Sequence, residues 1–489
     1  MLKDLYSYLR GRKILILGFG AEGRSSLNFL NEHAEQIQAD SVGVADMNPI
    51  DDELKYAGAV IEPVIGQDYL DAMADYDIVL KSPGIPFNHF NKHFLDGHWE
   101  LKEFSNVEIS GQMDLFLRFN EGKVIAVTGS KGKSTTTSLI YEILKKDTDD
   151  AYLLGNIGVP VLDHIADITE NSYVAVEAGV HQLEFCAASP EIAVVSNIYP
   201  EHLDHYQGYE DYYNSKLNLV RFQDVDDVVI LAASERELLE LALPISKAKK
   251  CLVFDEFEED NYDLLRKFDP ETLSTFTLED DKEFSHEEEQ SCIVVGYELE
   301  KNPHILGRHN YLDSLLAIAA TNMVGVDISD AIMSVANYEG LEHRLEYVGE
   351  FSGVKFYNDS IATIPKATRL ALEALKEIGE TTTILLGGLD RDLDYAELVE
   401  YLYDTDIRQV ICLPDTGRDI AQLIDGVNKV KNRSILAVEI ESMEEAVAEA
   451  FRLTKPGEIC LLSPAAASYN QYKNFAARGE AYKNAIQAH

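Results

Sequence analysis

The sequence predicts an α/β protein of three domains, covering residues 1–119, 120–340 and 341–489. A chain of 489 residues is too long for a single hydrophobic core. Short runs of Val, Ile and Leu alternate with amphipathic helical segments, which is typical of sheets covered by helices. Glycine-rich loops follow the leading strands of the first two domains, as in nucleotide-binding folds. We therefore expect a Rossmann-like first domain, a central phosphate-loop ATPase domain and a Rossmann-like third domain.

Composition excludes several classes of protein. No run of about 18 apolar residues exists, so we expect no membrane span. The polar start of the chain shows no signal peptide. The formal net charge of −43 argues against nucleic acid as a partner, and it means that local cations or helix ends must meet any anionic ligand. The five cysteines lack metal-ligand spacing and indicate reduced thiols in a cytoplasmic protein: Cys186, Cys251, Cys292, Cys412 and Cys460.

The first domain begins with a Rossmann fingerprint. A predicted strand, Lys13–Leu17, runs into the loop from Gly18 to Gly23, and a second strand ends at Asp46. The loop would bind a diphosphate, and the acidic side chain could take a ribose hydroxyl. A third strand ends in a turn containing Ser82 and Gly84. This turn either offers backbone N–H groups to a ligand or is purely structural.

The central domain begins with a phosphate-loop pattern. A predicted strand, Val124–Thr128, is followed by the loop Gly129-Ser130-Lys131-Gly132-Lys133-Ser134-Thr135 and a helix from Thr136 to Lys145. Its glycines would let backbone N–H groups close around phosphate oxygens at a helix N-terminus. Lys133 would reach the β and γ phosphates, and Ser134 or Thr135 would hold magnesium. The usual phosphate-loop motif has a further glycine five residues before Gly132, where this chain has Val127. The alternative to a phosphate-binding loop is therefore a glycine-rich turn with an exposed lysine.

Further polar residues follow at positions where a ligand could be met. Asn156 lies in an expected loop, and Glu177 ends a predicted strand, where its carboxylate could bind magnesium or simply be solvated. His202 follows the next strand as a metal ligand or a structural residue. Lys216 lies between apolar positions of a helix, where a snorkelling side chain is the default interpretation. Asn310, at the start of another helix, could cap it or read the edge of an adenine.

Together these segments resemble the Mur ligase family over nearly the whole chain, and most closely its members that add glutamate to UDP-N-acetylmuramoyl-L-alanine. Because the segments occur in the family's order, the resemblance is more specific than any single motif. The matching segments are Gly129–Thr135, Gly155–Gly158, Glu177 with Gln182–Glu184, Asn197–His205, Lys216, Gly307–Asn310, His343–Arg344, Asn358–Ser360 and Leu462–Gly479.

The resemblance implies roles for individual residues. Lys133 and Ser134 would hold the ATP phosphates and one magnesium ion, Glu177 would bind the same ion, and His202 would bind a second. Lys216 would carry a carbamate made from carbon dioxide and serve as a further metal ligand. The residues implied to contact the UDP-sugar are Gly18, Asp46, Ser82, Gly84 and Asn156. Those implied to contact ATP are Gly129 to Thr135, Asn310, Arg344 and Asp359. Those implied to contact glutamate are Thr363, Arg391, Ser468 and Phe475.

The expected reaction is an ATP-dependent amide ligation with two magnesium ions. The alanyl carboxylate would attack the γ-phosphate, and the glutamate amine would then displace phosphate from the acyl phosphate. Two positions depart from the family, which usually has lysine in place of Ile361 and Arg391. The segment from Glu177 to Gln182 also differs from the family, in which Ser-Ser-Phe is commoner at this place. These departures leave the choice between D- and L-glutamate open.

Two other functions remain as alternatives. Another Mur-type or folylpolyglutamate synthase-like ligase would share the ATP motifs, although the folate class begins with its ATPase domain. A nicotinamide-dependent oxidoreductase would use the loop from Gly18 to Gly23, but it would leave the phosphate loop at Gly129 unexplained.

We expect a monomer that binds small-molecule substrates.

Overall fold

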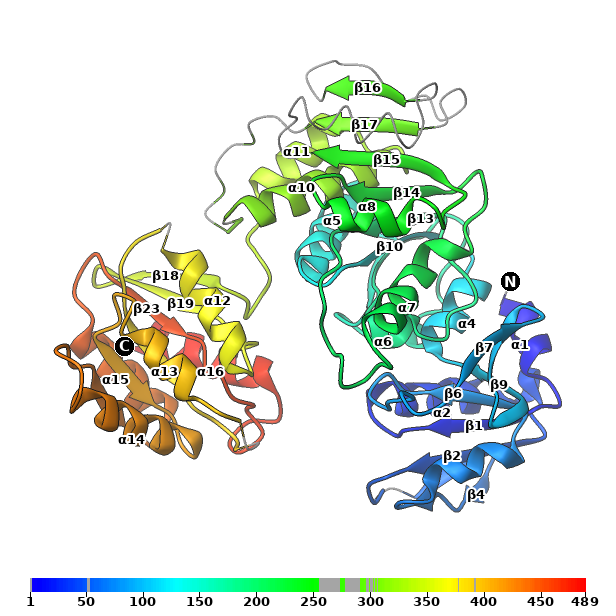
Figure 1. Ribbon diagram of the computed structural model, residues 1–489, viewed down its shortest axis with the longest axis horizontal. Helices are drawn as coiled ribbons and strands as arrows, with labels where there is room; N and C mark the ends of the chain where they lie inside the picture. The colour runs from blue at the N-terminus through cyan, green and yellow to red at the C-terminus, as the bar shows by residue number, and fades with distance from the viewer. Residues whose placement is uncertain are drawn as a thin grey trace. The chain divides into compact units, whose positions relative to one another are not determined.

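A computed structural model describes residues 2–50, 53–254, 273–277, 291–295, 299, 302, 304, 305, 307–376, 378–390 and 393–489. The chain forms two compact units (Figure 1). The first comprises Met1–Glu300 with His309–Ala336, and the second comprises Lys301–Arg308 with Asn337–His489. The α/β class predicted from the sequence is confirmed, and the division into three domains stays a prediction.

Among its described residues, the first unit contains two large sheets and the two-stranded sheet β3-β4. The N-terminal large sheet has seven strands in the order β5-β2-β1-β6-β9-β8-β7. Strands β5, β2, β1, β6 and β9 pair in parallel, and β8 and β7 add an antiparallel edge. The carboxyl ends of the parallel strands therefore meet at one edge. The elements are α1 (Leu2–Leu9), β1 (Lys13–Leu17), α2 (Ala21–Glu32), α3 (Ala34–Ile37), β2 (Ser41–Asp46), β3 (Leu54–Tyr56), β4 (Ala59–Ile61), β5 (Val64–Ile65), the 3-10 helix η1 (Tyr69–Asp75), β6 (Ile78–Lys81), β7 (Lys92–Leu95), β8 (His98–Leu101), β9 (Phe104–Ser110) and α4 (Gln112–Phe119).

The second sheet of this unit has eight strands in the order β11-β12-β10-β13-β14-β15-β17-β16, and all its pairings are parallel. Its central strands are buried on both faces, which explains their unbroken apolar runs. The elements are β10 (Lys123–Thr128), α5 (Lys133–Asp147), β11 (Ala151–Gly155), η2 (Val161–Asp163), β12 (Tyr173–Glu177), α6 (Val180–Leu183), β13 (Ile192–Val195), α7 (Tyr209–Arg221), β14 (Val228–Ala232), α8 (Arg236–Ala242), β15 (Lys249–Phe254), β16 (Leu273–Thr277), β17 (Ser291–Val295), α10 (Gly307–Asn322) and α11 (Ile328–Ala336).

The second unit is built on a six-stranded sheet in the order β18-β19-β23-β20-β21-β22, parallel except for the edge strand β18. Successive residues of a strand point to opposite faces, so Ile384 joins a core with α12–α14 and Leu385 joins a core with α15 and α16. The elements are β18 (Glu346–Phe351), β19 (Val354–Asn358), α12 (Pro365–Leu375), β20 (Thr381–Leu386), α13 (Ala396–Leu402), β21 (Gln409–Cys412), α14 (Thr416–Asn428), β22 (Leu436–Glu439), α15 (Met443–Leu453), β23 (Ile459–Leu462) and α16 (Phe475–Ala488).

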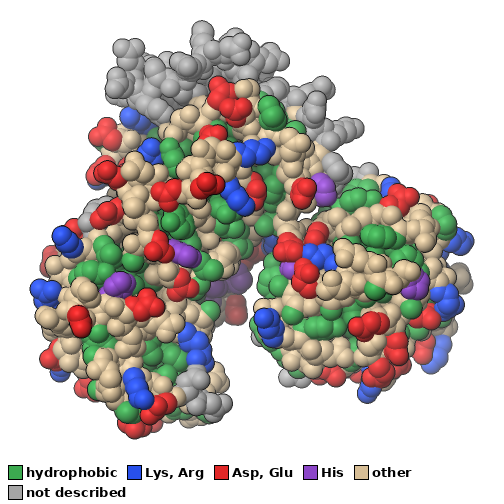
Figure 2. Space-filling model, turned by 180° about the vertical axis from the view of Figure 1, so that it is seen from behind, with side chains coloured by type: hydrophobic (Ala, Val, Ile, Leu, Met, Phe, Trp, Pro, Cys, Tyr) green, Lys and Arg blue, Asp and Glu red, His purple; other side chains and the backbone are tan. Residues whose placement is uncertain are grey.

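Several features bear on the predictions from composition. Among the helices that the structure describes, none combines the length and apolar character needed to span a bilayer. Acidic side chains are spread over the face of both units shown in Figure 2. The acidic runs at 255–260 and 280–289 lie outside the described residues, as does the side chain of Cys292. The other four cysteines are buried free thiols: Cys186, Cys251, Cys412 and Cys460.

Candidate active site

The phosphate loop lies between β10 and α5, as the sequence predicts, although α5 begins at Lys133 rather than Thr136. Gly132 adopts a left-handed backbone conformation with φ of +83°. A Cβ atom added there would lie 2.2 Å from Oδ1 of Asp313 on α10. Only glycine fits both constraints, so this turn and its contact with α10 are fixed by the sequence.

Two polar side chains hold the loop in shape. The Lys133 ammonium donates hydrogen bonds to the carbonyl oxygens of Gly129 (2.8 Å) and Ser130 (3.1 Å). The Asn197 side chain, which follows β13, accepts from the backbone N–H groups of Ser130 (2.9 Å) and Lys131 (2.8 Å) through Oδ1. Asn197 was not predicted as a site residue, because its partners become apparent only when β13 pairs beside β10.

Glu177 is a buried carboxylate next to this loop. It ends β12, where its register partners are Val127 on β10 and Gly155 on β11. The side chain is only 1% exposed, so the solvated alternative is wrong. Its Oε1 accepts a hydrogen bond from Nδ2 of the exposed Asn156 (2.7 Å), and its Oε2 is buried without a hydrogen-bond partner. An orphaned buried carboxylate oxygen fits a magnesium ligand.

Lys216 lies on α7 and is 1% exposed, which contradicts the snorkelling interpretation. Burial, followed by the charge of Lys133, lowers its pKa well below 10.5. The ammonium lies 5.1 Å from the ring centroid of Tyr212. No carboxylate among the residues that the structure describes lies within ion-pair distance of it. The side chain is therefore predominantly an uncharged amine when the pH exceeds this lowered pKa.

His202 lies near the same lysines. It has a φ of +54°, and its ring centroid is 4.8 Å from that of His181. Burial and the charges of Lys133 and Lys216 lower the pKa of His202, although Glu201 opposes them. A neutral imidazole is the form that binds a metal ion.

His181 has no predicted role. Its Nδ1 lies 2.9 Å from the Tyr206 hydroxyl, and its ring centroid is 4.0 Å from that of His205. Burial and the neighbouring histidines lower the pKa of His181 to about 3. The only sequence signal for His181 is that it lies in the segment from Glu177 to Gln182, which differs from the usual sequence of the family.

In the N-terminal sheet, the structure brings together three of the predicted UDP-sugar contacts. The Ser82 hydroxyl donates to the Gly18 carbonyl (2.7 Å), and Asp46 accepts from the backbone N–H groups of Phe19 (2.7 Å) and Asn48 (2.8 Å). Ser82 and Gly18 follow β6 and β1, and Asp46 is the last residue of β2, so all three lie at the shared carboxyl edge. The exposed Gly84 belongs to the same turn as Ser82.

A buried ion-pair cluster links the two sheets of the first unit. Glu184, after α6, lies 3.0 Å from the Lys81 ammonium of β6 and 2.7 Å from the Lys92 ammonium of β7. Burial opposes ionisation, but Lys81, His205 and Lys92 hold the pKa of Glu184 well below its usual range. The cluster therefore fixes the strand before Ser82 against the segment that carries His181. Sequence patterns gave no signal of it.

In the second unit, the structure places Asp359 beside the segment containing His343 and Arg344. Asp359 accepts hydrogen bonds from the Ser463 hydroxyl (2.7 Å) and the Leu345 backbone N–H (3.3 Å). Burial raises the pKa of Asp359 to about 7, against the influence of Ser463 and Arg344. This carboxyl group therefore titrates near neutral pH.

The predicted glutamate contacts lie in loops of this unit. Thr363 is half-buried, Ser468 is buried, and the exposed Phe475 begins α16. The Ser360 hydroxyl donates to the Phe475 carbonyl (2.8 Å), which ties the segment after β19 to α16. Arg391 lies outside the described residues. The predicted contact of Asn310 with adenine stays untested, as do the other roles.

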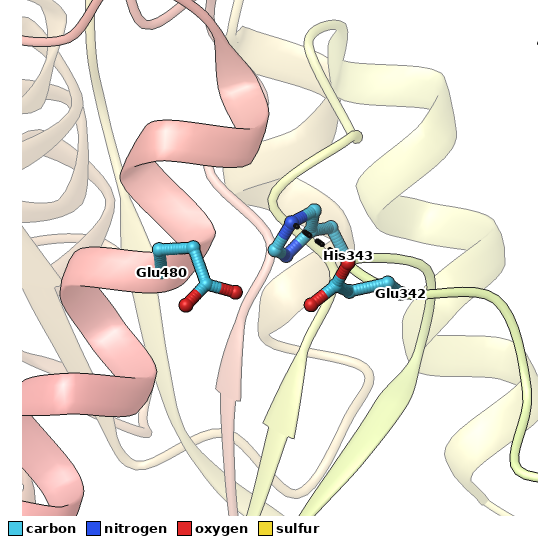
Figure 3. A group of neighbouring side chains, drawn as sticks. All are labelled: Glu342, His343 and Glu480. Atoms are coloured by element: carbon cyan, nitrogen blue, oxygen red, sulfur yellow. Dashed lines mark ion pairs between the residues drawn. The ribbon is translucent and has the colours of Figure 1, made fainter. Parts of the chain in front are cut away.

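Glu342, His343 and Glu480 form a cluster whose nearest ligand atoms lie within 4.8 Å of one another (Figure 3). Figure 3 shows that Glu480 extends from α16 and the other two from the segment before β18. The Lys483 ammonium already lies 2.5 Å from Glu342 and 2.6 Å from Glu480. Because this ammonium balances the carboxylates, we do not assign a metal to the cluster.

Comparisons with known proteins identify the family. The Mur ligase middle domain matches residues 127–321, and the Mur ligase glutamate ligase domain matches residues 343–466. The UDP-N-acetylmuramoylalanine–D-glutamate ligase of Clostridium botulinum strain Langeland is 30% identical, over 99% of this chain and 98% of the relative. The chain belongs to the Mur ligase family. The enzyme of the same name from Acetivibrio thermocellus is also 30% identical, over 100% of this chain and 98% of the relative.

Solved Mur ligases share the fold. The UDP-N-acetylmuramate–alanine ligase MurC of Thermotoga maritima aligns with a TM-score of 0.52 at 16% identity, over 98% of this chain and 99% of the other. MurF of Acinetobacter baumannii aligns with a TM-score of 0.53 at 16% identity, over 94% and 88%. The predicted family is thus confirmed, and the chain is an ATP-dependent ligase.

Proposed function

We propose that this Mur ligase joins D-glutamate to UDP-N-acetylmuramoyl-L-alanine in the cytoplasmic synthesis of peptidoglycan precursors. Relatives that carry this activity in their names match the chain end to end. The observation that carries the chemistry is the buried Glu177 with its orphaned oxygen beside a phosphate loop. We further propose a monomer of three domains, with the UDP moiety held by the loops after β1, β2 and β6.

The reaction needs two anions to meet. The alanyl carboxylate attacks the γ-phosphate of ATP, and ADP leaves as an acyl phosphate forms. The amine of glutamate then attacks the acyl carbon and loses a proton to solvent, the amide bond forms, and phosphate leaves. Magnesium, when bound, would cancel the repulsion between carboxylate and phosphate. Lys133 would leave the loop carbonyls and grip the β and γ phosphates, with Ser134 at the start of α5.

Glu177, His202 and Lys216 would supply the metal ligands. The buried amine of Lys216 is uncharged above its lowered pKa, so its nitrogen lone pair can attack the carbon of carbon dioxide. A carbamate forms, a proton leaves to solvent, and the side chain changes from a neutral amine to an anion. Burial that disfavours the ammonium therefore favours the carbamate once a metal is near.

In the second unit, Arg344 and Asp359 would contact ATP, and Thr363, Ser468 and Phe475 would contact the incoming glutamate. Asn310 would read the adenine edge. Arginine in place of lysine at Arg391 would keep a cation for a substrate carboxylate and allow a bidentate grip.

The test is ADP release with UDP-N-acetylmuramoyl-L-alanine and each glutamate enantiomer in turn. We expect turnover with D-glutamate and little with L-glutamate. Lys133→Ala should abolish ADP release while leaving the circular dichroism spectrum unchanged, since such clamps contribute roughly 3 kcal/mol or more to the barrier. Turnover with L-glutamate alone would reverse the assigned stereochemistry, and release with neither would refute the substrate assignment.

A further inference from the structure

The phosphate loop has fewer backbone donors for a triphosphate than its length suggests. Asn197 Oδ1 accepts the N–H groups of both Ser130 and Lys131. Its Nδ2 donates in turn to the Lys131 carbonyl (3.0 Å), as does the Ser196 hydroxyl (2.7 Å). The N–H groups left for phosphate are therefore those of Gly129 and Gly132 and those at the first turn of α5, from Lys133 onward, which helix geometry leaves without intrahelical acceptors.

The Lys131 side chain lies where it can replace the missing donors. The Asn197 side chain hydrogen-bonds both the N–H group and the carbonyl of Lys131, so the backbone from which the Lys131 side chain extends is fixed in position. Its ammonium lies 2.6 Å from Oε1 of Glu201, the residue before His202. The Lys131 side chain is 51% exposed and that of Glu201 is 19% exposed. An ion pair with so much exposure is weak and exchanges its partner readily.

The charge of Lys131 also acts on the interior of the site. Burial lowers the pKa of Lys216 most, the charges of Lys133 and Lys131 lower it further, and Glu201 raises it. The ammonium of Lys131 is thus close to the region between the loop and α7, where the γ-phosphate would project from the first turn of α5. A strongly negative chain needs such local cations to hold a triphosphate.

We propose that Lys131 is a second phosphate-binding lysine of the loop, held by Glu201 in the empty site and transferred to the γ-phosphate when ATP binds. The β-phosphate would be bound by the N–H groups of α5 and by Lys133, so Lys131 would distinguish a triphosphate from a diphosphate. The transfer also releases the Glu201 carboxylate beside His202. This inference rests on the proposed nucleotide site.

The test compares binding of two nucleotides without any turnover. Calorimetry with magnesium would measure the dissociation constants of ADP and of the non-hydrolysable triphosphate AMP-PNP for the full chain. In Lys131→Gln we expect AMP-PNP binding to weaken by about tenfold or more, since a charge-assisted hydrogen bond is lost. ADP binding should change by less than about threefold. Lys131→Arg, which keeps the charge, should restore most of the AMP-PNP affinity.

The matched control is Lys146→Gln, which removes the same charge from the exposed last turn of α5, the helix that follows the loop. It should leave both dissociation constants unchanged, because charges farther apart than a Debye length are screened by salt. Equal weakening of ADP and AMP-PNP in Lys131→Gln, or no weakening of either, would overturn the inference. If the unmodified chain bound neither nucleotide, the proposed nucleotide site itself would be refuted, and the two failures are thus distinct.

Discussion

Replacing Lys216 with methionine should stabilise the protein while abolishing its activity. The Lys216 side chain is 1% exposed and has no carboxylate within ion-pair distance among the described residues. The positive charge of Lys133 also disfavours its protonated form. Each unit by which burial lowers a pKa corresponds to about 1.4 kcal/mol of lost stability at a pH where the unfolded side chain is charged. Methionine fills a similar volume without this cost, so we expect a gain of about 1–3 kcal/mol.

The pH dependence gives this prediction a sign that can be checked. The pKa of Lys216 lies below 10.5 in the folded chain, so between the two values the unfolded chain binds a proton that the folded chain does not. The free energy of unfolding of the natural protein therefore rises with pH across this window. The methionine variant lacks this contribution, and its advantage should shrink as the pH approaches 10.5.

Urea denaturation in buffer freed of carbon dioxide, at neutral pH and near pH 10, would measure both effects. Lys146→Met, at an exposed position on α5, serves as the control and should change stability by less than about 0.5 kcal/mol. A methionine variant less stable than the natural protein at neutral pH would refute the argument that this lysine is an uncompensated buried amine. A variant that still releases ADP would refute its role in the reaction.

Three other substitutions test separate parts of the site. Glu177→Gln keeps an acceptor for Asn156 but removes the oxygen available to magnesium, so ADP release should fall by about 100-fold or more, measured against magnesium concentration. Gly132→Ala puts a side chain into a left-handed backbone conformation, where its Cβ would clash with Asp313. The free energy of unfolding measured by denaturation should therefore fall by at least about 1 kcal/mol, and ATP should bind more weakly. The pKa of Asp359 rises from 3.8 to about 7 on folding, so the folded carboxyl holds a proton that the unfolded one releases. The free energy of unfolding should therefore fall as pH rises through this range, and Asp359→Asn should remove that slope in urea denaturation at several pH values.

The strands that the sequence predicts correctly are those buried in parallel sheets. β1, β10 and β12 contain continuous apolar runs because both faces of each are covered. The hairpin of β7 and β8 was missed because its partly exposed residues lack that signature. Likewise β11 extends through 153–155, where a loop was expected, because pairing with β12 rather than local composition sets its end.

The site could be predicted where chemistry and backbone conformation coincide in one segment. Gly132 and Lys133 belong to a motif whose spacing follows from strand, turn and helix geometry, and Glu177 ends the neighbouring strand β12. Glu201 and Asn197 gave no comparable signal, because their contacts with the loop exist only after β13 has paired with β10. Burial of a charged side chain is equally invisible in a sequence, which is why Lys216 was assigned a solvated default.

The charges around the phosphate loop imply a coupling between carbon dioxide and magnesium. Burial lowers the pKa of Lys216, and the nearby charges of Lys133 and Lys131 lower it further, which favours the neutral amine at this position. In the proposed reaction, carbamate formation turns the neutral amine of Lys216 into an anion, which strengthens the binding of a cation there. By thermodynamic linkage, magnesium must then favour the carbamate by the same factor. The magnesium concentration needed for half-maximal activity should therefore rise as carbon dioxide is removed, and an unchanged magnesium requirement would show that this lysine does not carry the metal ligand.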